Sequence, residues 1–225
     1  QVKGVHWLRF LQKAGLGALL ADDMGLGKTV QVLCALNGRT LVVAPTSVLH
    51  NWVHEIERFR PGLRAQIYHG PHRSLDGEWD VLLTTYAILR LDAEILAAES
   101  WDTVVLDEAQ AIKNAASQTA RAVRELNVAR AIAMTGTPLE NHLGELWAQL
   151  DAVAPGALGS QQWFGQRFRT PIEKEGDVEL RQRLSRRIAP LMLRRTKQQV
   201  LAELPEKTET RREVTLSGAQ RELYE

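Results

Sequence analysis

Cysteine is almost missing from this sequence, in which Cys34 is the single thiol. One cysteine excludes an internal disulfide framework and any zinc site built from several thiolates. The six histidines do not stand at spacings typical of metal ligands, so we expect no zinc site. Cys34 itself is predicted to be a small residue of the core. This cysteine usage favours a protein of a reducing compartment.

Long apolar runs and a large net charge are also lacking. No run approaches the roughly 20 residues of a membrane-spanning helix, and the opening QVKGVHWLRF has neither the apolar stretch nor the cleavage site of a signal peptide. The 28 basic and 27 acidic residues nearly cancel, so the overall charge favours no polyanionic partner. With 225 residues, 44% of them hydrophobic, the chain can bury a core without disulfides or metals. We therefore expect a soluble protein with no membrane partner.

The first 140 residues alternate short apolar runs with helical patterns. Runs rich in Val, Ile and Leu without polar alternation are typical of strands buried on both faces of a sheet. Helical spacing between such runs favours right-handed crossovers and a parallel sheet. The sequence therefore predicts an α/β fold. The expected strands cover 18–21, 40–44, 63–68, 80–84, 101–106 and 130–135, and the first helices cover 29–36 and 47–59.

The pattern changes after Pro138. A helix is expected over 143–154, followed by a loop with Pro155 and Gly156. Nothing between 161 and 204 resembles a strand, and 163–169, 177–188 and 190–204 have helical patterns. We therefore predict an α/β domain over 1–150, a small helical element over 151–204 and a polar connecting segment over 205–225.

The strongest chemical signal is DDMGLGKT, which lies between an expected strand and an expected helix. Glycines allow successive N–H groups to face inward, and the helix start adds partial positive charge. A lysine ammonium can reach the β- and γ-phosphates, and a threonine hydroxyl can bind Mg²⁺. The alternative is a glycine-rich helix start with a surface lysine. The predicted phosphate loop consists of Asp22, Asp23, Met24, Gly25, Leu26, Gly27, Lys28 and Thr29.

The second signal is DEAQ at 107–110, which directly follows the run VVL. Ligands of parallel sheets bind at the edge where the strands end. Asp107 can hold Mg²⁺ there, and Glu108 can orient and deprotonate an attacking water. Acidic residues after a strand also commonly cap the next helix, which is the alternative interpretation.

Hydroxyl residues follow three further expected strands. Thr135, Gly136 and Thr137 end the run AMTGT and can relay the state of a γ-phosphate, unless they form only a Gly-Pro turn. Hydroxyls at such edges also suit the phosphate oxygens of a nucleic-acid backbone, although each can equally be a helix cap. The candidate nucleic-acid contacts are Thr46, Ser47, Thr84, Thr85 and Tyr86.

Arginine is concentrated between residues 181 and 195, where six arginines occur without any acidic residue. Such a cluster can be a solvated helix face. It can equally be a surface that faces a polyanion such as DNA. The sequence leaves both interpretations open.

Together the motifs resemble those of the SWI/SNF-type helicase-like ATPases within helicase superfamily two. The resemblance is highly specific and runs along nearly the whole chain. The Walker A pattern G-x-x-x-x-G-K-[ST] has its first glycine where this chain has Asp22, and an aspartate there is usual in this family. Motif II more often ends in histidine, and Gln110 is a familiar variant at that position. The similar segments are QVKGVHWL (1–8), DDMGLGKT (22–29, motif I), LVVAPTSVLHNW (41–52, motif Ia), TTYAIL (84–89, motif Ib), DEAQ (motif II), MTGTPLEN (134–141, motif III), WFGQRFRTPIEKEGD (163–177, protrusion) and LMLRRTKQQVLAELPEKTE (191–209).

The resemblance implies a RecA-like lobe of the P-loop NTPase class over 1–150, with a helical protrusion over 151–204. It implies ATP and Mg²⁺ as ligands, Gln1 as the residue that reads adenine, and Gln110 as part of the coupling motifs. Lys28, Asp107 and Glu108 would be catalytic, and Thr29 and Asp107 would hold Mg²⁺.

The resemblance also implies translocation along double-stranded DNA without strand separation, and the remodelling of a DNA-bound protein that stays unidentified. Residues 205–225 would lead to a second RecA-like lobe, which in relatives supplies arginines for the developing phosphate charge. Such arginines contribute about 10³–10⁵ in rate. We therefore expect this chain alone to hydrolyse ATP weakly or not at all.

Two alternative functions stay open. One is a strand-separating or RNA-dependent helicase, although RNA enzymes of the superfamily tend to have Ser-Ala-Thr where this chain has Thr-Gly-Thr at 135–137. The other is a non-catalytic, nucleotide-gated DNA-binding module. The expected location is the cytoplasm or nucleoid of a prokaryote, which DEAQ and the compact loops favour, or the nucleus of a eukaryote.

Overall fold

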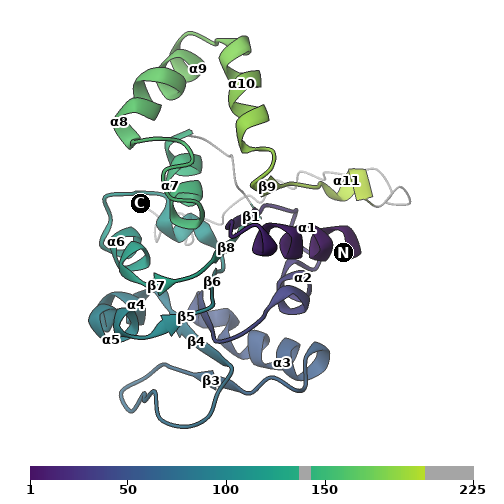
Figure 1. Ribbon diagram of the computed structural model, residues 1–225, viewed down its shortest axis with the longest axis vertical. Helices are drawn as coiled ribbons and strands as arrows, with labels where there is room; N and C mark the ends of the chain where they lie inside the picture. The colour runs from purple at the N-terminus through teal and green to yellow at the C-terminus, as the bar shows by residue number, and fades with distance from the viewer. Residues whose placement is uncertain (137–142, 201–225) are drawn as a thin grey trace, which may run out of the picture.

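The computed structural model describes residues 1–136 and 143–200. A seven-stranded sheet forms its centre, with the order β3-β4-β2-β6-β8-β1-β9, and every pairing described within it is parallel (Figure 1). The strands are β1 (Ala18–Leu20), β2 (Thr40–Ala44), β3 (Ala65–Ile67), β4 (Val81–Thr85), β6 (Thr103–Leu106), β8 (Ala131–Met134) and β9 (Met192–Leu193). A small separate sheet pairs β5 (Ser100–Trp101) with β7 (Asn127–Val128).

Helices cover both faces of the sheet (Figure 1). On one face lie α1 (Val2–Lys13), α2 (Lys28–Ala35), the short η1 (Thr46–Val48) and α3 (Leu49–Phe59). On the other lie α4 (Tyr86–Leu91), α5 (Ala93–Ala98), η2 (Ala109–Ile112), α6 (Gln118–Glu125) and α7 (Leu143–Val153). This is the expected RecA-like arrangement.

Alternation along each strand divides the core into two layers. Leu20 and Val42 pack under α1, α2 and α3, whereas Leu19 and Val43 pack towards α4 to α7. Successive side chains of a strand point to opposite faces, so a strand covered on both sides needs apolar residues at every position. The parallel α/β fold expected from these runs is confirmed.

One expected strand is divided. The run 101–106 forms β5 and β6, which are separated by Asp102. The Oδ2 atom of Asp102 accepts a hydrogen bond from the backbone N–H of Arg39 at 2.7 Å, so the chain turns there to satisfy the carboxylate. The buried part of the run enters the central sheet between β2 and β8.

The helix expected over 190–204 is wrong in its first part. Met192–Leu193 forms strand β9, which pairs with β1 at the edge of the sheet. Leu19 and Ala21 donate their backbone N–H groups to the carbonyls of Leu191 and Leu193, at 2.8 and 2.7 Å. An unpaired edge strand favours a partner for its backbone groups, and a two-residue strand has no periodicity by which it could be predicted. We call residues 191–197 the return segment.

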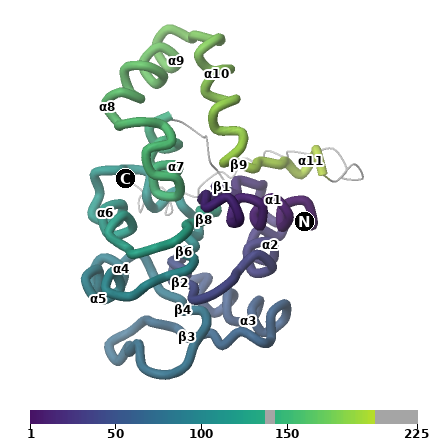
Figure 2. Tube along the Cα trace, viewed as in Figure 1, coloured from purple at the N-terminus to yellow at the C-terminus, as the bar shows by residue number. Residues whose placement is uncertain are grey.

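The predicted helical element is formed by α8 (Gln161–Phe164), the π-helical turn η3 (Gly165–Arg169), α9 (Thr170–Lys174) and α10 (Val178–Ile188). These helices stand beyond one end of the sheet (Figures 1 and 2). Their buried side chains, such as Phe164, Phe168 and Leu184, continue the core layer under α7. The boundaries at 150 and 204 stay predictions, although β9 lies in the central sheet.

The last residue of the return segment is also the first of α11 (Lys197–Val200), which matches the helical pattern there. Residues 201–225, which include the expected linker, lie outside the described part of the chain. Within residues 1–136 and 143–200, no helix combines the length and apolarity that crossing a membrane needs.

Candidate nucleotide-binding site

The predicted phosphate loop connects the carboxyl end of β1 to the first turn of α2. Gly25 and Gly27 have φ values of 83° and 74°, a left-handed conformation that only glycine adopts readily. Gly27 is also the residue from which α2 begins. A side chain at Gly27 would meet Nε2 of Gln1 at 2.5 Å, so Gln1 lies against the loop. The loop therefore presents backbone N–H groups and a helix N-terminus, the arrangement that binds phosphate.

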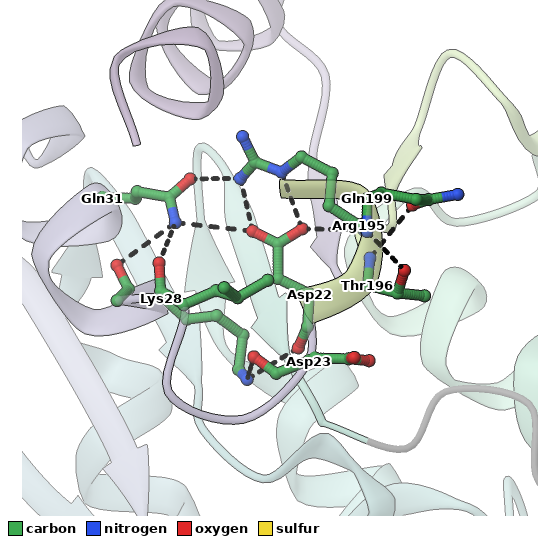
Figure 3. Close-up of polar contacts among 9 residues, drawn as sticks. Asp22, Asp23, Lys28, Gln31, Arg195, Thr196 and Gln199 are labelled. Carbon is green, nitrogen blue, oxygen red and sulfur yellow. Dashed lines mark hydrogen bonds and ion pairs between the residues drawn. The ribbon is translucent and has the colours of Figure 1, made fainter. Parts of the chain in front are cut away.

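Lys28 is folded onto this loop. Its Nζ donates hydrogen bonds to the carbonyl oxygens of Asp22 at 2.8 Å and Asp23 at 3.3 Å (Figure 3). Burial lowers the pKa of Lys28 from its usual value, while nearby carboxylates, Glu108 foremost, raise it. The ammonium thus lies among the groups that were predicted to act together.

Asp107 is held at the end of β6 by contacts from three elements. Its Oδ2 accepts a hydrogen bond from the indole Nε1–H of Trp52 at 2.9 Å, and its Oδ1 accepts one from the backbone N–H of Glu108 at 2.9 Å. The hydroxyl of Tyr86 donates to its carbonyl oxygen at 2.7 Å. Burial raises the pKa of Asp107, and the Trp52 hydrogen bond opposes that rise. The apolar helical pattern around Trp52 contains no signal for this contact.

Glu108 has a φ of 49°, and it is the single non-glycine residue with positive φ within the described residues. Such a conformation is strained for a side chain of this size and is found preferentially at functional sites. Its Oε2 accepts a hydrogen bond from Nε2 of Gln110 at 2.8 Å. Gln110 in turn accepts one on Oε1 from the hydroxyl of Thr135 at 3.0 Å. A chain of hydrogen bonds therefore joins the end of β6 to the end of β8.

Gly136 brings the third motif against the phosphate loop. A side chain there would meet Cγ of Met24 at 2.8 Å and Nζ of Lys28 at 3.9 Å. Thr137, the remaining residue of the predicted coupling set, lies outside the described residues. Thr29 is half-buried in the first turn of α2.

Asp22 is the first residue of the predicted phosphate loop. Its carboxylate is fully buried and is bonded to Arg195 and Gln31 (Figure 3). A direct contact between this carboxylate and ATP stays a prediction, and the observed partners point to a structural task instead. Arg195 was counted in the arginine cluster from the sequence, but its guanidinium pairs with the buried Asp22 and is not part of the exposed charge of that cluster.

The candidate nucleic-acid contacts fall into two groups. Thr46 and Ser47 are exposed after β2. Thr84 is buried and donates its hydroxyl to the carbonyl of Tyr68 at 2.9 Å, and the Thr85 hydroxyl caps α4 by accepting from the N–H of Ile88 at 3.2 Å. The hydroxyls of Thr84, Thr85 and Tyr86 thus have partners inside the protein, which favours the alternative interpretation as internal contacts and caps.

The arginines of the cluster are mostly exposed, and some of them also make contacts inside the protein. Arg181, Arg183, Arg186, Arg187 and Arg194 are exposed. Arg187 donates from Nε and Nη2 to the carbonyl of Ala157, at 3.1 and 2.9 Å. Its guanidinium also lies 5.8 Å from the ring centre of Trp163. The cluster therefore holds both free positive charge and structural contacts.

The residues expected to hold a metal fit Mg²⁺ better than zinc. Within the described residues, no group of three or more His, Cys, Asp or Glu side chains could hold a metal ion. Mg²⁺ bound with nucleotide uses one or two protein oxygens, while phosphates and waters supply the rest. Thr29 and Asp107 provide oxygens of the kind that this binding mode needs.

Comparison with known proteins identifies relatives along the whole chain. The family described as the SNF2-related domain matches residues 1–225. YwqA of Bacillus subtilis, which bears the name of an ATP-dependent helicase/translocase, is 43% identical over 100% of this chain and 26% of its own length. The human SWI/SNF-related matrix-associated actin-dependent regulator of chromatin subfamily A member 1 is 36% identical over 100% of this chain and 23% of its own length. The chain thus spans about a quarter of the length of these curated relatives.

Two solved structures from Sulfolobus solfataricus have the same fold. The SWI2/SNF2 ATPase core in complex with double-stranded DNA matches with a TM-score of 0.82 and 42% identity, over 87% of this chain and 43% of that one. The SWI2/SNF2 ATPase core domain matches with a TM-score of 0.81 and 40% identity, over 99% of this chain and 48% of that one. The sequence motifs, the fold and these matches agree, and the chain belongs to the SNF2-related domain family.

Proposed function

We propose that this chain is the ATP-binding half of a motor that hydrolyses ATP with Mg²⁺ and is stimulated by double-stranded DNA. The observation that carries the proposal is the meeting of three strand ends. Lys28 follows β1, Glu108 follows β6 and Gly136 follows β8. The charge of Glu108 acts on the Lys28 ammonium, and Nζ of Lys28 lies 3.9 Å from the point where a side chain at Gly136 would begin. A lysine, a pair of carboxylates and a phosphate loop at one sheet edge are the parts that phosphoryl transfer needs.

Each part has a definite task in this proposal. The loop amides and Lys28 bind the phosphates, and Thr29 and Asp107 hold Mg²⁺, which neutralises phosphate charge when bound. Glu108 orients and deprotonates the attacking water. Gln1, which lies against the loop, contacts the base. The hydrogen bonds from Glu108 through Gln110 to Thr135 link the water-activating residue to the third motif.

The proposed nucleic-acid partner is double-stranded DNA, because the solved ATPase core with a TM-score of 0.82 is in complex with it. We place a second RecA-like lobe among the partners, since this chain covers only 43% and 48% of the matched ATPase cores. Thr46 and Ser47 are the exposed DNA candidates at the same edge. The protein displaced on DNA stays unidentified. The proposed location is where DNA is found, the nucleoid or the nucleus.

Steady-state ATP hydrolysis tests the proposal. The full-length protein is compared without nucleic acid and with duplex DNA, single-stranded DNA and RNA, and Glu108→Gln serves as the blank. We expect strong stimulation by duplex DNA alone, and weak hydrolysis by residues 1–225 in isolation. Equal stimulation by single strands or RNA would favour a strand-separating or RNA-dependent helicase. Nucleotide binding without hydrolysis under every condition would favour a nucleotide-gated module.

A further inference from the structure

Asp22 is a buried carboxylate that accepts hydrogen bonds from two residues, Arg195 and Gln31. It is 0% exposed. Its Oδ1 accepts hydrogen bonds from the backbone N–H and from Nε of Arg195, each at 3.0 Å. Its Oδ2 accepts from Nη2 of Arg195 and, at 3.4 Å, from Nε2 of Gln31. Two parallel hydrogen bonds from one guanidinium fix the geometry of a carboxylate more tightly than a single point charge does.

Gln31 extends this network to the phosphate loop itself. Its Nε2 donates to the carbonyl oxygens of Leu26 and Gly27, at 3.3 and 3.2 Å. Its Oε1 accepts from Nη2 of Arg195 at 2.6 Å, which orients the amide (Figure 3). Arg195 therefore fixes both the residue that opens the loop and the residue that holds the carbonyls at its end.

The rest of the return segment also contacts the loop. Asp23 donates its backbone N–H to the carbonyl of Arg195 at 3.0 Å, and Lys197 donates its backbone N–H to Oδ2 of Asp23 at 2.9 Å. Nζ of Lys197 lies 3.8 Å from the point where a side chain at Gly25 would begin. Like the Arg195–Asp22 pair, which is separated by 173 residues in the sequence, these contacts join distant parts of the chain.

The space around the network is closed by α1. Gly4 is buried in that helix, and a side chain there would collide with Oε1 of Gln31 and approach Nη2 of Arg195 to 2.9 Å. The absence of a side chain at this position thus lets α1 pack directly over the Gln31–Arg195 pair. The network has little room to adopt a second arrangement while the return segment is docked.

We propose that Arg195 is a positioning residue of the nucleotide site. Through Asp22 and Gln31 it holds the phosphate loop in its binding shape, and bound nucleotide in turn holds the return segment against the sheet. The inference rests on the proposed function, because it needs nucleotide in this loop. Coupling between two binding events is reciprocal, so both effects have the same size.

Nucleotide affinity gives the first test. Mg²⁺ and a slowly hydrolysed ATP analogue are titrated into the full-length protein, its Arg195→Lys variant and the control Arg194→Gln, which alters the exposed neighbouring arginine. Arg195→Lys keeps the positive charge but cannot make the two parallel hydrogen bonds of a guanidinium, so we expect the affinity for the nucleotide analogue to fall about tenfold. Arg194→Gln is expected to stay within about twofold of the wild type, since surface changes away from such contacts have small effects.

A second variant separates positioning from folding. Loss of Arg195 alone leaves a buried carboxylate without its partner and can unfold the chain. The double variant Asp22→Asn/Arg195→Gln removes both charges and keeps polar groups that can pair. We expect it to restore the melting temperature but not the nucleotide affinity. Recovery of both would show that Arg195 only neutralises Asp22, which would overturn the positioning role.

Hydrogen exchange of the return segment gives a readout that a merely structural residue would not change. We expect nucleotide to slow exchange in residues 193–197 about tenfold in the wild type and Arg194→Gln, but not in Arg195→Lys at saturating nucleotide. Unchanged exchange in a wild type that binds nucleotide would overturn this inference and leave the proposed function standing. A wild type that binds no nucleotide would overturn the proposed function, and this inference with it.

Discussion

The indole N–H of Trp52 donates a hydrogen bond across 2.9 Å to Oδ2 of Asp107. Trp52 is itself buried on the face of α3 that packs into the core layer. The helix that follows the exposed Thr46 and Ser47 thus contacts the carboxylate proposed to hold Mg²⁺. Any movement of this helix reaches Asp107 directly, without an intervening side chain.

Trp52→Phe removes this hydrogen bond and keeps most of the packing. A hydrogen bond to a charged group contributes about 1.5–3 kcal/mol, so we expect a lower melting temperature and hydrolysis reduced about tenfold. The bond lowers the pKa of Asp107, and its loss should shift the acid limb of the kcat/KM profile to higher pH. The control is Trp101→Phe, which removes a 2.8 Å hydrogen bond to the carbonyl of Leu96 in the opposite core layer. Equal losses of activity in both variants would contradict a specific role for Trp52.

Asp107→Asn should stabilise the fold while abolishing hydrolysis. Burial raises the pKa of Asp107, so the native state binds its proton more tightly than the unfolded chain does. The ionised carboxylate of Asp107 therefore lowers the free energy of unfolding at any pH above its folded pKa. This destabilisation disappears as the pH falls through the folded pKa towards the unfolded pKa. We expect the melting temperature to rise by a few degrees at pH 7.5 and the difference to vanish near the unfolded pKa. Exposed Asp76→Asn is the control. A gain that persists at low pH would contradict this account.

Thr135→Val tests the hydrogen-bond chain between the second and third motifs. The change keeps the shape and removes the hydroxyl that donates to Gln110 at 3.0 Å. We expect basal hydrolysis to stay within about twofold and the stimulation by DNA to fall about fivefold, because coupling energies of this kind are typically 1–3 kcal/mol. Thr103→Val is a matched control, since it removes a buried hydroxyl that has no hydrogen-bond partner within the described residues. Normal stimulation in Thr135→Val would mean that the contact is only structural.

Two neighbouring arginines of the cluster should respond differently. Arg186 is exposed, so Arg186→Glu is expected to weaken DNA binding and to reduce the salt slope by about 0.9 per lost phosphate contact. Arg187 donates to the carbonyl of Ala157, so Arg187→Glu should chiefly lower the melting temperature. Exposed Arg90→Glu, on α4, controls for the change in net charge. Unchanged DNA binding in Arg186→Glu would leave the cluster as a solvated face.

Much of the fold could be predicted because its signals are local. Strands such as β2 and β4 are buried on both faces, so each contains an uninterrupted apolar run, with threonines only at one end of the strand. The backbone shape of the predicted phosphate loop also has a local signal, since Gly25 and Gly27 have a conformation that few other residues adopt. The topology of a parallel sheet then places Lys28 and Asp107 at one edge.

The remaining features depend on residues far apart in the chain. Nothing near Met192 or Leu193 predicts a strand, because two residues have no period and their partner lies about 170 positions earlier. The ion pair between the Asp22 carboxylate and the Arg195 guanidinium joins residues 173 positions apart, and no local pattern indicates it. The sequence by itself determined the layers of the domain and the identity of the phosphate-binding and carboxylate motifs. Only the tertiary structure decided which charges pair and which stay free, because burial of a charge depends on what the fold brings beside it.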